Sequence, residues 1–136
     1  MTSPVLALRR AIIDAASVDA ELRALMGGTL RLYDEPPRGA DPVYALFGDV
    51  KAEDWSTDLD RGHAQSVDLV IWSEKGGART ALMVADRFFA ILDDAPLTLD
   101  GHRLVNLRVI ELTSALDKDS GLACVTLRLR AVTEVV

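Results

Sequence analysis

The strongest constraint on the fold is a strict two-residue alternation near the end of the sequence. Every second residue from Ala123 to Ala131 is apolar, whereas the residues between them include Thr126, Arg128 and Arg130. Because neighbouring side chains of a strand point to opposite sides of a sheet, this pattern predicts a strand with one buried and one polar face. Antiparallel sheets commonly place one face on the core and the other in water. The sequence therefore predicts a sheet that is covered by helices on one side only.

Two segments have the spacing of helices that cover such a face. The first opens with a capping hydroxyl at Ser3 and a proline at position 4, where a missing N–H costs nothing. We expect it to run for roughly three turns, to break near Ser17 and to continue as a short piece that stops at residues 27–28. The second helix is predicted over Ala78–Leu92. Its predicted buried stripe consists of Leu82, Ala85, Phe88, Phe89 and Leu92. The residues predicted to face water are Arg79, Asp86 and Arg87.

The remaining segments alternate or are rich in strand-forming residues. Strands are predicted over residues 29–33, 43–53, 63–73, 102–112 and 123–131. Within residues 43–53 we expect Tyr44, Leu46 and Val50 on one side of the sheet. Polar loops are predicted at residues 34–42, 53–62 and 114–121. This order of elements predicts an α+β fold, an antiparallel or mixed sheet with two main helices packed on one face.

Length and composition are those of a single-domain protein. With 136 residues, 49% of them hydrophobic and 26% charged, the chain can bury one core and is too apolar to be disordered. We expect one domain over residues 1–136 and no membrane span, since no apolar run approaches about 18 residues. A net charge of −6 disfavours DNA binding through phosphate. The lone Cys124 fits assembly in a reducing cytoplasm.

The sequence contains weak candidates for metal or catalytic chemistry. Asp58, Asp60 and His63 are the set that suggests a small metal-dependent hydrolase, but their spacing matches no dedicated ligand arrangement. Residues 117–121 are similar to the start of a calcium loop, and Arg128 stands where the closing glutamate belongs. No motif activates a serine. We therefore predict no catalytic residue, no metal and no cofactor, and keep the hydrolase as the less favoured alternative.

A resemblance to a known family extends over nearly the whole chain. The order and spacing of several segments resemble the tail-completion proteins, or tail terminators, of long-tailed phages and gene transfer agents. Besides the opening helix, the segments that carry it are Arg31-Leu32-Tyr33-Asp34 with the proline-rich loop after it, Pro42-Val43-Tyr44-Ala45-Leu46-Phe47-Gly48, His63 through Val70-Ile71-Trp72-Ser73 to Gly76-Gly77, and Leu99-Asp100-Gly101-His102-Arg103-Leu104-Val105.

The resemblance implies a structural protein without enzymatic activity, which forms a ring, usually a hexamer, at the head-proximal end of a tail tube. Such a ring ends tube growth and binds two partners, the major tail tube protein and the head–tail connector or stopper protein, while DNA passes through its lumen as cargo. The implied location is a virion or phage-like particle assembled in the bacterial cytoplasm. The alternative within this class is another connector component, a stopper or adaptor.

The loops are the segments best suited to docking on other proteins. Trp55 is a large aromatic residue in a charged stretch, which is typical of a residue that anchors a protein contact. The predicted contact positions are Asp34, Pro37, Trp55, Asp58, Asp117 and Asp119.

Overall fold

The computed structural model describes residues 3–35, 38–39 and 42–136 as three helices and five strands. The helices are α1 (Pro4–Ser17), α2 (Ala20–Leu25) and α3 (Ala78–Leu92). The strands are β1 (Leu32–Tyr33), β2 (Tyr44–Asp54), β3 (Gly62–Lys75), β4 (His102–Leu116) and β5 (Leu122–Val135). The α+β class predicted from the sequence is confirmed.

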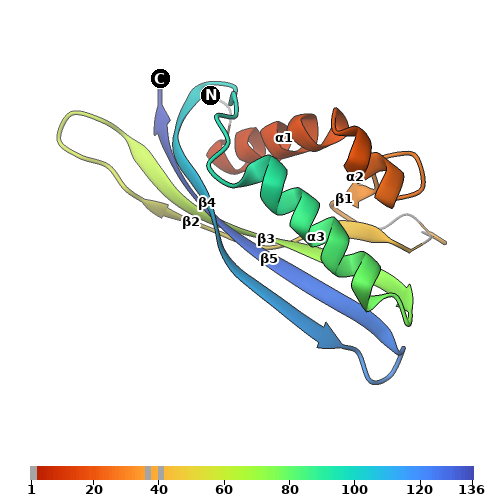
Figure 1. Ribbon diagram of the computed structural model, residues 1–136. Coiled ribbons are helices and arrows are strands. Elements are labelled where there is room, and N and C mark those ends of the chain that lie inside the picture. Colours follow the sequence, from red (N-terminus) through yellow and green to blue (C-terminus); the bar gives the residue numbers. More distant parts are fainter. Residues whose placement is uncertain (1–2, 36–37, 40–41) are drawn as a thin grey trace.

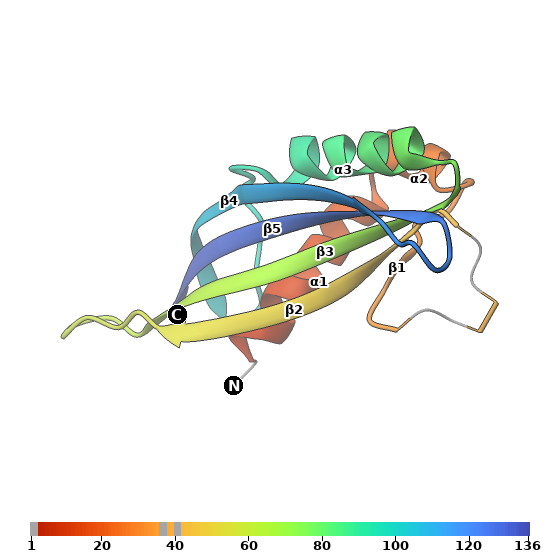
Figure 2. The same cartoon turned by 90° about the horizontal axis from the view of Figure 1, so that it is seen from below.

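All five strands belong to one mixed sheet. Their order is β1-β2-β3-β5-β4, with β1 parallel to β2 and every other neighbouring pair antiparallel. The three helices gather on one side of this sheet (Figure 1). The opposite side carries no helix of the described chain, and from that side α1 is seen behind the strands (Figure 2). We call this uncovered side the open face.

The core lies between the helices and the covered face of the sheet. The alternation of β5 is confirmed, because Val125, Leu127 and Leu129 are fully buried while Arg128 and Arg130 lie on the open face. The sheet contributes Ala45, Phe47, Val67, Leu69, Ile71, Val125, Leu127, Leu129 and Ala131, and the helices contribute Ala7, Leu8, Ala11, Ile12, Ala16, Leu22, Ala81, Val84, Ala85, Phe88 and Leu92.

The predicted opening of α1 and the break after it are confirmed. The Ser3 hydroxyl accepts the N–H of Leu6 at 3.4 Å, and α1 ends at the predicted break. Asp19 then caps α2, since its carboxylate accepts the N–H of Leu22 at 2.9 Å. The same carboxylate binds Arg87 of α3 through two hydrogen bonds of 2.8 and 2.6 Å. Arg87, predicted to face water, therefore ties α2 to α3.

The first two strands differ from the predicted ones. Residues 29–31 lie outside a strand, and β1 has only two residues. In β2 the pairing with β3 shifts between Phe47 and Val50, which is the mark of a β-bulge. Tyr44 and Leu46 both lie on the open face. Val50 is paired with the buried Val67 of β3 and therefore lies on the opposite face, which the helices cover. The predicted common side for all three was wrong because an inserted residue reverses the alternation.

The buried stripe of α3 differs in part from the predicted one. Ala85, Phe88 and Leu92 are fully buried as predicted, whereas Leu82 is 37% and Phe89 is 44% exposed. Helical periodicity allowed either stripe, since apolar residues surround more than half of this helix. Packing on the sheet selected the small residues Ala81 and Ala85, which bring the helix axis close to β3 and β5.

The last hairpin has a longer strand and a shorter turn than predicted. Strand β4 continues to Leu116, four residues beyond its predicted end at Leu112, so the predicted loop over residues 114–121 reduces to a turn over residues 117–121. The strand was predicted to end early because Thr113 and Ser114 are polar. In the structure both belong to β4, where they are paired with Thr126 and Val125 of β5.

Replacing Asp19 tests the junction between α2 and α3. Asp19→Ala removes the cap and both hydrogen bonds to Arg87, so we expect the free energy of unfolding to fall by about 1–2 kcal/mol in urea denaturation. Asp14→Ala is the matched control, because Asp14 is an exposed helix residue whose ion pair with Arg10 joins neighbouring turns of α1. It should change stability by less than about 0.5 kcal/mol. Equal losses for both variants would contradict this role of Asp19.

The same ion pair predicts a pH dependence. Hydrogen bonds from Arg87 lower the pKa of Asp19 below its ordinary value. The charged form therefore adds stability that is present above the unfolded pKa and is lost as the pH falls through the folded pKa. The stability difference between the natural chain and Asp19→Asn should be full at neutral pH and shrink below about pH 4 in urea titrations. A pH-independent difference would contradict this.

The two neighbouring phenylalanines of α3 test its rotation. Phe88→Ala should lower the free energy of unfolding by roughly 3–5 kcal/mol, because it empties a fully buried position. Phe89→Ala should cost only about 1 kcal/mol, since much of that ring already contacts solvent. Chemical denaturation of the two variants gives the comparison, and equally large losses would favour the stripe predicted from the sequence, which contains both rings.

Candidate protein-contact surfaces

The predicted contact residues lie at two opposite ends of the molecule. Trp55 and Asp58 belong to the connection between β2 and β3, which projects from one end of the sheet in both views (Figures 1 and 2). Asp34, after β1, and Asp117 and Asp119, between β4 and β5, lie at the other end. Pro37 lies outside the described residues. The described contact positions therefore form two separate groups, one at each end of the molecule.

The projecting end is an arm formed by residues 51–61. Every residue of this arm is exposed, including Trp55 at 56% and Leu59 at 93%. The arm is a continuous hairpin in which the N–H of Trp55 donates to the carbonyl of Gly62 at 2.9 Å and the N–H of Thr57 donates to that of Asp60 at 2.8 Å. At its base a Cβ on Gly62 would lie 2.9 Å from the carbonyl oxygen of Thr133, so the close approach of these strands requires glycine. The arm is ordered by its backbone and buries almost no side chain.

Charged side chains accompany Trp55 where the arm joins the open face. The guanidinium of Arg130 lies 5.5 Å from the centre of the Trp55 ring, within the range of a cation–π contact. Lys51 binds Glu53 at 2.7 Å, which raises the pKa of Lys51 and lowers the pKa of Glu53. A hollow of about 300 Å³ lies between these residues. Trp55 thus leans toward the sheet on one side and keeps more than half of its surface in solvent.

At the opposite end, Asp34 is held by an arginine of α1. Arg9 binds the Asp34 carboxylate at 2.8 Å and places its guanidinium 4.6 Å from the centre of the Phe47 ring. Asp34 is itself well exposed, with 65% of its side chain accessible. The start of the proline-rich loop is therefore fixed to the body of the protein while its carboxylate stays accessible.

The turn at residues 117–121 is shaped by the Asp117 side chain. The Asp117 carboxylate accepts the Ser120 hydroxyl at 2.7 Å and the N–H of Asp119 at 3.3 Å, and these bonds lower the pKa of Asp117. Asp117 therefore stabilises the turn. Asp119 is exposed to solvent and remains available for contacts.

The open face carries paired charges. Asp68, only 7% exposed, accepts Arg128 at 3.0 Å, and Arg128 also lies 3.6 Å from Glu111. Arg108 and Arg130 stand directly opposite each other, an arrangement that is unfavourable without partners. Arg108 binds Asp93 at 3.3 Å and Arg130 turns toward Trp55. The predicted polar character of this face is confirmed, and most of its charge is neutralised within the chain.

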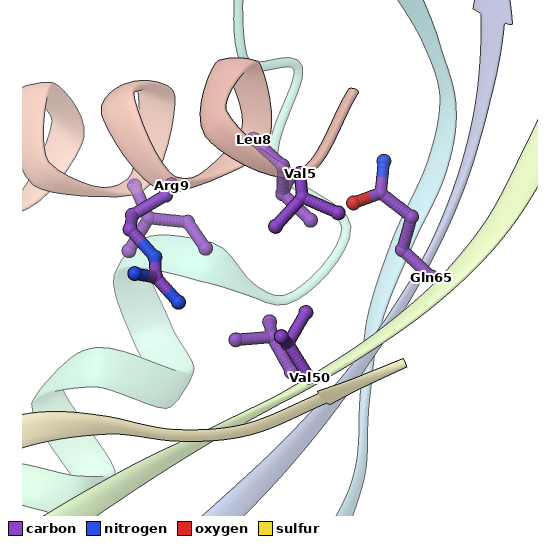
Figure 3. Close-up of a pocket in the computed structure, with 7 residues that line it drawn as sticks. Val5, Leu8, Arg9, Val50 and Gln65 are labelled. Atoms are coloured by element: carbon purple, nitrogen blue, oxygen red, sulfur yellow. The ribbon is translucent and has the colours of Figure 1, made fainter. Parts of the chain in front are cut away.

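The seam between α1 and the β2–β3 pair contains two unpartnered polar atoms. It is lined by apolar side chains together with Arg9 and Gln65 (Figure 3), and the space between them is too small for a water molecule. The Gln65 amide donates to the carbonyl of Pro4 and to Thr133, both at 3.1 Å. Its Oε1 and the Nε of Arg9 lack a partner among the described residues. This seam is a packing contact that anchors the start of α1, and it offers no ligand cavity.

The residues of the hydrolase alternative form no metal site. Within residues 3–35, 38–39 and 42–136, no three His, Cys, Asp or Glu side chains are grouped so that they could hold a metal ion. Asp58 and Asp60 lie on the exposed tip of the arm, whereas His63 is half-buried at its base. Cys124 is half-buried on the open face, and burial raises the pKa of its thiol, which makes it a weak nucleophile.

Sequence reasoning missed one exposed apolar surface. Leu112 and Leu116 of β4 are 42% and 65% exposed, and Leu82 and Phe89 of α3 are also exposed. The sequence does contain a signal for the end of β4, since Leu112, Ser114 and Leu116 continue the alternation of that strand. The exposure of Leu82 and Phe89 depends on how α3 lies on the sheet, which periodicity alone does not decide.

Comparisons with known proteins identify the family. Residues 10–134 match the family described as tail completion protein gp17. The chain belongs to the tail completion protein gp17 family. The resemblance seen in the sequence is thereby confirmed, and the chain is a structural protein of a phage-type tail.

A solved structure agrees with this assignment. A protein in the "Virion of native gene transfer agent (GTA) particle" superimposes with a TM-score of 0.88 at 26% sequence identity, over 98% of this chain and 99% of that one. No curated protein matches at a significant level. Among the described residues, no helix has the length and apolar character required to cross a membrane. This member of the gp17 family thus shares its whole domain with a virion protein.

Two arginines of the open face test its ion pairs. Arg128→Met leaves the largely buried Asp68 carboxylate without its cation, so the thermal midpoint should fall more than in Arg130→Met, whose partner Trp55 is exposed. Adding Asp68→Asn to Arg128→Met should recover part of the loss, because a neutral amide is less costly to leave unpaired. Equal midpoints for the two single variants would show that Asp68 does not depend on Arg128.

Proposed function

We propose that this protein is the tail terminator of a phage-like particle, a ring of six copies at the head-proximal end of the tail tube. In this role it ends tube growth and joins the tail to the head–tail connector, and it works through shape without catalysing a reaction. The observation that carries the proposal is the family match over residues 10–134, supported by the near-complete superposition on a gene transfer agent virion protein.

The charge of the chain is compatible with DNA as passing cargo. Each copy has a net charge of −6, so six copies carry −36, six times that value. An acidic ring has no overall attraction for the phosphate backbone, and a duplex that moves through it is not retained. The arginines of the open face agree with this, because Arg128 and Arg108 are neutralised by acidic neighbours.

The surfaces at the two ends of the molecule supply separate contacts for two different partners. The arm lies at one end, and the Asp34 and Asp119 positions lie at the other. A terminator contacts the tail tube protein on one side of the ring and the connector protein on the other. We propose that the two groups of exposed residues divide these contacts between them.

Binding to isolated tails tests the proposal. Tails produced without this protein should bind the purified chain at one end, and electron-microscopic density should show a ring between the tube and the connector. Tube protein added afterwards should no longer extend the bound tails. Asp14→Ala, an exposed change on α1 that touches none of the predicted contact residues, is the folded control and should bind equally well.

The same assay separates the terminator from a stopper or adaptor. A stopper binds DNA-filled heads in preference to free tails. Binding to heads alone, or density for this chain elsewhere in the particle, would contradict the terminator role and favour the alternative connector component.

A further inference from the structure

The sheet has two free edges, and they are protected to different degrees. On the β2 side, the two-residue strand β1 pairs only with Ala45 and Leu46, so the rest of β2 has an open edge. That edge contains a bulge and four charged residues, Asp49, Lys51, Glu53 and Asp54. Bulges, charges and very short edge strands are the usual devices that prevent a free edge from pairing with other chains. The β2 side is therefore protected against pairing.

The second half of β4 forms the opposite margin of the sheet and lacks this protection (Figure 1). On its outer side no strand of the described chain is paired with it. Both bulges of β4 lie before residue 111, so residues 111–116 pair regularly with β5. Residues 112–116 contain no charged residue and no proline, and all are exposed. An exposed, regular and uncharged edge is a template for an added strand.

Apolar side chains border this edge on the covered side of the sheet. Leu112 and Leu116 pair with residues of β5 that are buried beneath the helices, so they share the covered face. On α3, Leu82 and Phe89 are seven residues apart and lie on one side of the helix. We define the ledge as Leu82, Phe89, Leu112 and Leu116, which are 37%, 44%, 42% and 65% exposed.

The side of α3 that belongs to the ledge faces β4. Arg87 binds Asp19 from the other side of the helix, so that side faces α2. At the end of α3, the Asp93 carboxylate accepts the N–H of Val109 in β4 at 2.9 Å. From Asp93 back to Leu82 the helix covers about 16 Å, a length that a strand covers in about five residues. Leu82 therefore lies level with the end of β4, and the ledge and the free edge form one surface.

The same edge of a second copy is the partner that fits this surface. In an antiparallel pair of identical strands, a register centred on Ser114 would pair all five residues of the segment 112–116. Leu112 of each copy would then lie opposite Leu116 of the other, on the same face of the joined sheet, and the two ledges would meet. The other free edge of the chain does not compete, because its charges and its bulge prevent pairing.

The distribution of charge permits this pairing between identical chains. Each copy has a net charge of −6, but the segment 112–116 has no charge, so two such segments do not repel each other. The flanking carboxylates are engaged within their own chain, since Glu111 lies 3.6 Å from Arg128 and Asp117 accepts the Ser120 hydroxyl at 2.7 Å. In the centred register Glu111 would face Asp117 of the other copy. Like charges opposite each other are unfavourable and confine the pairing to the neutral segment.

We propose that free copies of this chain form a twofold dimer in which the segments 112–116 pair antiparallel and the two ledges pack together. This isologous contact is complete at two copies and covers the unprotected edge and the ledge at once. It leaves the arm exposed, because the arm and the end of β4 lie at opposite ends of the molecule in both views (Figures 1 and 2). The inference goes beyond the proposed function, since a contact that closes at two copies does not build a ring of six.

Sedimentation equilibrium over a concentration series tests the dimer. The natural chain should shift from one copy to two as its concentration rises, and no larger species should form. The double variant Leu112→Glu, Leu116→Glu should remain monomeric, because each new carboxylate would lie opposite another across the pair. The matched control Val18→Glu, Leu59→Glu adds the same charge at positions that are 77% and 93% exposed, and it should dimerise as the natural chain does.

Two outcomes of this measurement would overturn the proposal. One is a natural chain that stays monomeric up to high micromolar concentration. The other is equal dimerisation of the two charged double variants, which would place the contact elsewhere on the molecule. Thermal unfolding of each variant checks that its fold is retained.

Disulfide formation tests the register. In a Cys124→Ser background, Ser114→Cys places the two thiols at the twofold axis, where paired Cβ atoms lie about 4.5–5.5 Å apart, and mild oxidation should give covalent dimers. An equal mixture of Leu112→Cys and Leu116→Cys chains should also give dimers, whereas either chain alone should give few. Val18→Cys, at an exposed position outside the contact, measures random collision. No dimer from Ser114→Cys, or as much from Val18→Cys, would contradict the contact.

The outcomes separate this inference from the proposed function. If the natural chain is monomeric and binds tail ends, the dimer is wrong and the terminator role stands. If it dimerises but does not bind tails, the dimer stands and the terminator role is wrong. If it is monomeric and the Leu112→Glu, Leu116→Glu variant no longer binds tails, the edge serves a tail component and the dimer is wrong.

Discussion

The structure depends on burying one face of a five-stranded sheet and leaving the other open. The apolar residues of β3 and β5, such as Leu69, Ile71 and Leu127, pack beneath three helices, and this is the only extended apolar layer among the described residues. A sheet covered on one side retains a polar face and, unless it closes into a barrel, two free edges. The surfaces available for assembly are therefore direct consequences of how the core is built.

Charge is distributed so that these surfaces have different properties. On the open face, Asp68 and Glu111 neutralise Arg128, and Asp93 neutralises Arg108, which leaves little net field there. The β2 edge is charged, and the last residues of β4 are not. For a structural protein of a phage-type tail, this contrast limits which surfaces associate with other components.

Bulges decide which side chains reach the core and which reach solvent. The shift between Phe47 and Val50 moves Val50 to the covered face, so the following residues of β2 enter the arm with reversed orientation. A shift between Val109 and Glu111 does the same in β4 and places Leu112 on the covered face beyond the reach of α3. Both the arm and the free end of β4 thus begin at a bulge, where an extra residue increases twist and redirects the strand.

The sequence by itself determined the α+β class, the break between α1 and α2, the limits of α3 and the two faces of β5. These features follow from local capping and from side-chain periodicity, which act over a few residues. The ordered segments also indicated the family, and the loops indicated exposed positions such as Trp55 and Asp119. Only the tertiary structure decided the side on which Val50 lies, the exposure of Leu82 and Phe89, and the exposure of Leu112 and Leu116. Each of these depends on packing or pairing between segments distant in sequence, and a bulge or a small helix rotation changes it without altering the local pattern.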